Sequence, residues 1–272
     1  MTVHPRVAEV VADYLDLVDA EAGGPVTGLY LEGSVAIGDF RPHASDVDFV
    51  AVGEDPPDAV ALAALERVHA RLGERRPGLH FDGAYLTWQD LASGPDAAVG
   101  RPSIEEGRFR ATSDRLSPVT WHTLARYGVV CRGPAVADLD IWADDEVLAA
   151  WQDANLDEYW GRLLARTAGL VDSPGPFSRT DDATAWTVTG VPRLHYTLTT
   201  GDITSKDGAG RHALRVFPER WHRVVREGLR ILRAEDDQSL YGDPGERWQD
   251  VLAFGEMVIA DAHRCYAERH RS

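Results

Sequence analysis

Residues 29–52, LYLEGSVAIGDFRPHASDVDFVAV, decide the fold of the N-terminal half of this chain, because they set a Gly-Ser turn and an Asp-x-Asp pair at the ends of two apolar strands. Gly33 and Ser34 are small enough for backbone N–H groups to approach an anion closely, and Ser34 adds a hydroxyl. Side chains on a strand alternate between its two faces, so Asp46 and Asp48 point to one side. Two carboxylates on one face suit a hard cation such as Mg²⁺, which also binds nucleotide phosphates.

The Gly33-Ser34 turn, the Asp46-x-Asp48 pair and the eleven residues between them resemble the signature of the nucleotidyltransferases of the DNA polymerase beta superfamily. Within that superfamily the chain is most similar to the bacterial streptomycin/spectinomycin adenylyltransferases. The phrase GDFRPHASDVDFVAV carries the likeness in the first half, and YTLTTGDITSKDGAGRHAL carries it in the second. The resemblance implies an α/β (α+β) N-terminal nucleotidyltransferase domain with a mixed sheet, followed by an all-α helical bundle.

Apolar periodicity predicts the elements around the quoted stretch. Helical stripes indicate helices over residues 7–18, 57–76 and 118–126, and strand composition marks residues 79–88 and 128–131, the latter as an edge strand. Residues 92–117 are rich in Gly, Pro and charge, so we expect a loop or lid there, with at most short helices.

The composition changes near residues 138–145, and beyond them only helical stripes appear. Such stripes, joined by loops such as residues 172–178, are typical of a helical bundle. We therefore predict a nucleotidyltransferase domain over residues 1–143 and a C-terminal helical domain over residues 144–272.

Asp82 is the polar residue in the predicted strand at 79–88. A strand beside the Asp-x-Asp strand would turn Asp82 toward the same metal ions, and the resemblance implies that an acidic residue here completes an acidic triad. The similar enzymes typically have glutamate at this place, which reaches one methylene further. Three roles stay open for Asp82, namely general base, metal ligand or both, and an aspartate that merely caps a turn is the alternative.

Lys206 is the only lysine in the chain, and it lies in the second family-like phrase. A compact ammonium group is a good partner for a phosphate, although a preference for Arg codons would also leave few lysines. The resemblance implies that the helical domain supplies Arg193 and Lys206 to a triphosphate held at Ser34; an exposed arginine that only solvates a helix is the alternative for Arg193. Asp181 and Asp182 lie, one residue out of register, where the family presents acidic residues to its antibiotic.

Charge and composition restrict the partners. The 28 basic and 44 acidic residues give a formal net charge of -16, which repels nucleic acid and attracts a polycationic small molecule, although acidity can also serve solubility alone. No apolar run is long enough to span a bilayer and the first residues lack a signal-peptide core, so we expect a cytoplasmic protein with no membrane partner. Cys131 and Cys265 form no C-x-x-C pattern, so the sequence indicates neither a disulfide framework nor a zinc site, and we expect two buried free thiols.

Together these features predict transfer of AMP from ATP to a hydroxyl of a small cationic acceptor such as an aminoglycoside. Two Mg²⁺ ions can stabilise the entering and the leaving oxygen of such an in-line displacement. Asp46 and Asp48 would hold both ions, while Asp82 would bind one and accept the hydroxyl proton. The residues predicted to orient the phosphates are Gly33, Ser34, Arg193 and Lys206. The alternatives are modification of a protein or tRNA end, as in toxin-antitoxin nucleotidyltransferases, and a non-catalytic nucleotide or drug sensor; no oligomeric state is predicted.

Overall fold

The computed structural model describes residues 3–24, 26–113, 116–168, 180–235 and 238–271. The chain divides into two compact units, Met1–Asp144 and Asp145–Ser272. The predicted loop at residues 172–178 lies outside the described residues. None of the helices in the described ranges has both the length and the apolar character that a bilayer crossing requires.

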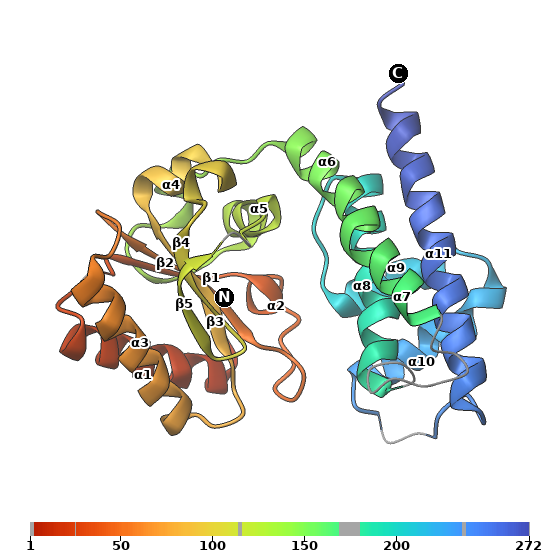
Figure 1. Ribbon diagram of the computed structural model, residues 1–272, viewed down its shortest axis with the longest axis horizontal. Helices are drawn as coiled ribbons and strands as arrows, with labels where there is room; N and C mark the ends of the chain where they lie inside the picture. Colours follow the sequence, from red (N-terminus) through yellow and green to blue (C-terminus); the bar gives the residue numbers. More distant parts are fainter. Residues whose placement is uncertain (1–2, 25, 114–115, 169–179, 236–237, 272) are drawn as a thin grey trace. The chain divides into compact units, whose positions relative to one another are not determined.

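The first unit is a mixed sheet with helices on both faces (Figure 1). Its strands are β1 (Gly28–Leu31), β2 (Val47–Gly53), β3 (Phe81–Thr87), β4 (Arg101–Glu105), β5 (Arg108–Ser113) and β6 (Val129–Arg132), in the order β5-β4-β3-β2-β1-β6. Its helices are α1 (Pro5–Glu21), α2 (Gly33–Ala36), α3 (Ala59–Arg75), α4 (Trp88–Ser93) and α5 (Pro118–Tyr127), with short 3-10 turns at Pro95–Ala98 and Val136–Asp138. Strands β2 and β3 run parallel, and the other paired strands are antiparallel.

Both faces of the sheet are buried, which explains why β1 and β2 read as continuous apolar runs. Helices α1 and α3 lie side by side on one face, where Leu29, Leu31 and Phe49 are in the core (Figure 1). Helices α4 and α5 cover the other face, where Tyr30 and Val50 are in the core. The alternation along each strand therefore assigns successive side chains to different layers, as the sequence predicted for β2.

The predicted loop at residues 92–117 is wrong, because this segment contains the β4–β5 hairpin as well as short helices. Glu105 pairs with Arg108, so the hairpin turns through the two residues Glu106 and Gly107. Both have positive φ, 49° and 70°, as the common two-residue hairpin turn requires. Strand β5 is an edge strand with mostly exposed side chains, so its sequence lacks the apolar alternation by which strands are predicted.

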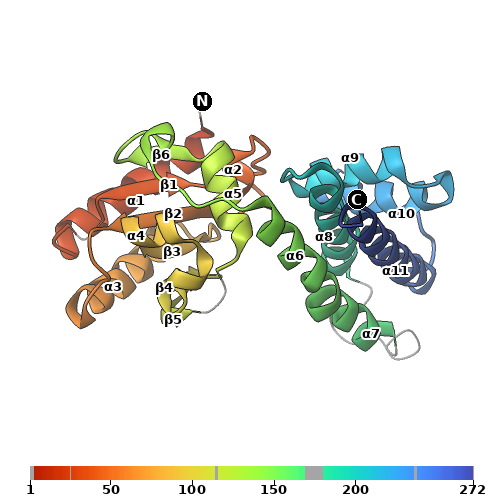
Figure 2. The ribbon, with the colours of Figure 1, turned by 90° about the horizontal axis from the view of Figure 1, so that it is seen from above.

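The second unit is helical throughout its described part, as predicted. It contains α6 (Asp145–Asn155), a π-helical turn (Leu156–Gly161), α7 (Arg162–Ala168), α8 (Asp181–Thr200), α9 (Lys206–Val216), a 3-10 turn (Glu219–Trp221), α10 (His222–Leu232) and α11 (Pro244–Arg269). Helix α8 is the central helix, because it packs against α9, α10 and α11 and contributes many of the core side chains (Figure 2). Both cysteines are free, as predicted, but each is half-buried rather than buried.

Candidate functional site

Asp48 and Asp82 are neighbours on the two parallel strands at the centre of the sheet. They are paired across β2 and β3, which places their Cα atoms about 5 Å apart. On the opposite face the rings of Phe49 and Phe81 stack with centroids 4.4 Å apart, which opposes slippage of the two strands. Asp46 is exposed and directly precedes β2. Its negative charge adds to the rise that burial causes in the pKa of Asp82. The three predicted metal ligands therefore come together at the start of two adjacent strands.

Gly33 brings the chain that follows β1 against Asp48. The Glu32 N–H donates to the Asp48 carbonyl oxygen at 2.9 Å, which ties this segment to β2. Gly33 has φ of +57°, and a Cβ at this position would lie 2.0 Å from Asp48 Oδ2. Glycine is thus required both for the backbone conformation and for the close approach. The predicted turn continues directly into the short helix α2.

Ser34 follows in α2 and carries a buried hydroxyl. Its Oγ has no hydrogen-bond partner among the described residues. A buried hydroxyl without a partner is costly unless another group satisfies it, so a bound anion or water is a suitable partner at this position.

The β4–β5 hairpin holds the carboxylate of Asp82. The backbone N–H of Glu106 donates to Asp82 Oδ2 at 2.6 Å, and that of Gly107 donates to Oδ1 at 3.4 Å. Burial raises the pKa of Asp82, these two donors oppose the rise, and the nearby Asp46 adds to it. The raised pKa favours a carboxylate that can accept a proton.

Glu32 is a fourth acid at this place, and the sequence analysis did not single it out. Burial and the neighbouring Asp48 raise the pKa of Glu32 to about 8, while a hydrogen bond with Thr120 opposes the rise. The signal was present in the sequence: Tyr30 and Glu32 are two residues apart, so strand alternation assigns Glu32 to the layer of Tyr30. We call Glu32, Asp46, Asp48 and Asp82 the acidic cluster.

A cavity of about 580 Å³ adjoins the acidic cluster within the first unit. Glu32, Asp48 and Asp82 line it, and Arg108 and Arg110 of β5 also contribute. The cavity therefore presents both carboxylates and guanidinium groups, a combination that suits a metal ion together with an anionic group. The two arginines were missed because the segment that carries them was predicted to be a loop.

The remaining predicted site residues lie in the second unit. Lys206 is the first residue of α9, and its Nζ lies 4.9 Å from the ring centroid of Trp186 on α8. Arg193 follows Trp186 by seven residues and thus lies on the same face of α8. Asp181 and Asp182 form the first turn of α8. Asp181 accepts a hydrogen bond from Arg247 at 2.7 Å, which gives it a structural partner.

Two family models match the chain. Residues 15–92 match the nucleotidyltransferase domain, and residues 164–254 match the C-terminal domain of aminoglycoside adenylyltransferase. The first range covers Gly33, Ser34 and all four members of the acidic cluster, and the second covers Arg193 and Lys206. No curated protein matches the chain.

Among solved structures, the chain is similar to the spectinomycin adenyltransferase AAD(9) from Enterococcus faecialis, crystallised with ATP and spectinomycin. The TM-score is 0.64 at 13% sequence identity, and the match covers 92% of this chain and 98% of the other. At this identity the likeness shows a shared fold.

Proposed function

We propose that this chain, an aminoglycoside adenylyltransferase-like nucleotidyltransferase, is a metal-dependent enzyme that moves AMP from ATP to a hydroxyl of a small cationic acceptor, most simply an aminoglycoside-type antibiotic. The observation that carries this proposal is the pairing of Asp48 with Asp82 on adjacent strands beside Gly33 and Ser34. The solved structure of similar fold holds ATP and spectinomycin, which supports the choice of both substrates.

The acidic cluster fits divalent ions. Its donors are all carboxylate oxygens, which hard cations such as Mg²⁺ prefer. Burial raises the pKa of both Glu32 and Asp82, and the neighbouring carboxylates of Asp48 and Asp46 add to the rise. Asp46 and Asp48 would hold the two ions, with Asp82 as a further ligand. When bound, the ions would supply positive charge to the phosphate oxygens on which negative charge develops. A site lined by carboxylates would otherwise repel a nucleotide, so a chelator should abolish turnover.

The chain's own residues would provide orientation and proton transfer. The unpartnered hydroxyl of Ser34 would donate to a phosphate oxygen, and Gly33 lets the backbone approach it. Asp82, whose raised pKa suits a base, would accept the proton of the acceptor hydroxyl. Arg193 and Lys206 would bind the nucleotide phosphates. An acidic protein with a net charge of -16 favours a cationic acceptor over a nucleic acid.

The deciding experiment is an acceptor screen. The protein is incubated with ATP, Mg²⁺ and a panel of aminoglycosides and spectinomycin, and each acceptor is analysed by mass spectrometry. We expect one acceptor to gain the mass of a single adenylyl group. An adenylyl group found on a polypeptide or tRNA would show that the acceptor is a macromolecule. Tight ATP binding without any product would indicate a sensor.

A matched pair of variants tests the site. Asp48→Asn should lose metal-dependent turnover and keep its fold, because an amide replaces a metal-binding carboxylate at nearly constant volume. Asp96→Asn removes an exposed carboxylate of the same unit and should keep full activity. An active Asp48→Asn enzyme would contradict the metal assignment.

A further inference from the structure

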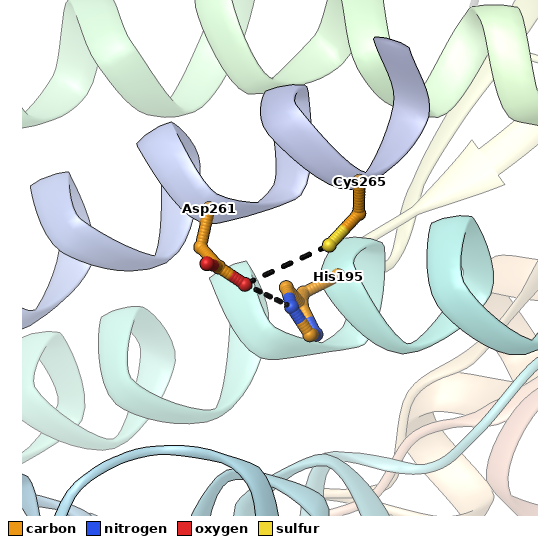
Figure 3. Close-up of side chains that lie close together, drawn as sticks. All are labelled: His195, Asp261 and Cys265. Atoms are coloured by element: carbon orange, nitrogen blue, oxygen red, sulfur yellow. Dashed lines mark hydrogen bonds and ion pairs between the residues drawn. The ribbon is translucent and has the colours of Figure 1, made fainter. Parts of the chain in front are cut away.

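Three potential metal ligands that the proposed reaction does not use meet in the second unit. His195 of α8 faces Asp261 and Cys265 of α11 (Figure 3). His195 Nε2 lies 3.0 Å from Asp261 Oδ2, Cys265 Sγ lies 3.7 Å from the same oxygen, and the three ligand atoms are all within 4.8 Å of one another. We propose that His195, Asp261 and Cys265 bind a transition-metal ion, with Zn²⁺ as the best match.

The ligand types and spacing support this assignment. Zn²⁺ binds imidazole nitrogen and carboxylate oxygen at about 2.0–2.2 Å and thiolate sulfur at about 2.3 Å, so tetrahedral ligand atoms are roughly 3.3–3.6 Å apart. The observed distances from Asp261 Oδ2, 3.0 Å to His195 Nε2 and 3.7 Å to Cys265 Sγ, differ from these values by a few tenths of an ångström. Asp261 and Cys265 are one helical turn apart, so both project from one face of α11. A water molecule or a fourth donor would complete the coordination.

The residues around the three ligands are those that a metal site needs. His195 Nδ1 lies 3.0 Å from Nε2 of His212, which can accept a proton from it and orient the ring. The other oxygen of Asp261, Oδ1, accepts from Arg264 at 2.6 Å, which directs Oδ2 toward His195 and Cys265. Arg264 also pairs with Glu268, so its positive charge is shared between two carboxylates. The local charge therefore stays negative once Cys265 is a thiolate.

Protonation of the two histidines is compatible with binding. A carboxylate oxygen only accepts, so Nε2 is the nitrogen of His195 that carries the proton beside Asp261. Without metal, His195 Nε2–H donates to Asp261, and Nδ1 accepts from His212. With metal, Nε2 carries the lone pair that binds the ion, and Nδ1–H donates to His212, so both rings change tautomer and stay neutral. The one proton released to solvent is that of the Cys265 thiol.

The three proposed ligands differ in solvent exposure, which gives an ion a route from solvent to the site. The side chain of His195 is only 4% exposed, whereas that of Asp261 is 30% exposed. Cys265 is half-buried. The ion would therefore reach the carboxylate and thiol first and the histidine last.

Cobalt is the probe, because Co²⁺ substitutes for Zn²⁺ and reports its ligands by absorption. Reduced, chelator-treated full-length protein is titrated with Co²⁺, and Zn²⁺ is then added. We expect a thiolate-to-cobalt charge-transfer band that saturates at one ion per chain, together with the intense visible bands of tetrahedral cobalt. Added Zn²⁺ should remove both. The acidic cluster contains only oxygen donors and cannot give the thiolate band, so the result is independent of the proposed transferase activity.

Matched cysteine variants decide the assignment. Cys265→Ser should lose the charge-transfer band, whereas Cys131→Ser, which changes the free cysteine of the first unit, should keep it. His195→Gln should weaken Co²⁺ binding at least tenfold. Circular dichroism checks that each variant is folded. The proposal is overturned if the native protein, with its thiols shown to be reduced, gives no band at millimolar Co²⁺, or if the band persists in folded Cys265→Ser.

Discussion

Substitution of Gly33 by alanine tests whether the position of Asp48 controls the reaction. An added Cβ would lie 2.0 Å from Asp48 Oδ2 and 2.8 Å from its Cγ. Real Cβ contacts are essentially never shorter than 3.0 Å. The carboxylate and the loop must therefore separate by at least the difference between 3.0 and 2.0 Å, which is 1.0 Å.

A shift of this size predicts a large loss of activity. Misplacement of a catalytic group by about 1 Å can cost roughly 100-fold in rate. We therefore expect Gly33→Ala to turn over about 100-fold more slowly than the native enzyme at saturating ATP and acceptor. Alanine at φ of +57° also costs about 1–2 kcal/mol in backbone strain, so the free energy of unfolding should fall by at least that amount.

Gly78→Ala is the matched control, because it carries the strain without the collision. Gly78 has φ of +77°, and a Cβ there would meet nothing within 4 Å. This variant should lose about 1–2 kcal/mol of stability and keep its activity. Both variants are measured by steady-state adenylyl transfer over a range of Mg²⁺ concentrations and by urea unfolding.

The reasoning is refuted if Gly33→Ala is folded and works within about threefold of Gly78→Ala. That result would mean that the Asp48 carboxylate can move by about 1 Å without slowing the reaction. Asp48 would then hold no ion that the reaction needs.

Three further predictions concern single side chains. Above pH 8, where Glu32 is ionised, Glu32→Gln removes one negative charge from the acidic cluster and should raise the Mg²⁺ concentration for half-maximal rate several-fold, whereas the exposed Glu74→Gln should not; equal values would exclude Glu32 from ion binding. Burial lowers the pKa of His69 to about 3, so its contribution to stability is complete above pH 6.5 and falls as the pH decreases toward 3. Between pH 6.5 and 4.5 the loss should be about 2 kcal/mol in urea unfolding, and His69→Gln should not show it; the same pH dependence in both proteins would contradict the assignment. Lys206→Ala should raise the KM for ATP more than the KM for the acceptor, and an unchanged KM for ATP would show that Lys206 does not bind the nucleotide.

Local sequence patterns were sufficient for the centre of the first unit. Buried strands are continuous apolar runs, and polar residues that interrupt them at fixed spacing must share a face, so the amino-acid pattern placed Asp48 and Asp82 on strands. The family resemblance implied that the two residues meet, and the structure pairs them on adjacent strands. The helical stripes of the second unit are equally local, which is why the fold class was predicted correctly. The β4–β5 hairpin was missed because an exposed edge strand such as Arg108–Ser113 has no apolar face to reveal it.

The sequence by itself thus determined which elements form and which acids interrupt them, because periodicity and spacing act over a few residues. Tertiary structure alone decided which distant groups meet. The backbone of Glu106 reaches Asp82 only through a hairpin, and Cys265 joins His195 only because α8 packs against α11. Burial and charge at such meeting points depend on contacts between elements remote in the chain, and a pattern that extends over one element carries no information about them.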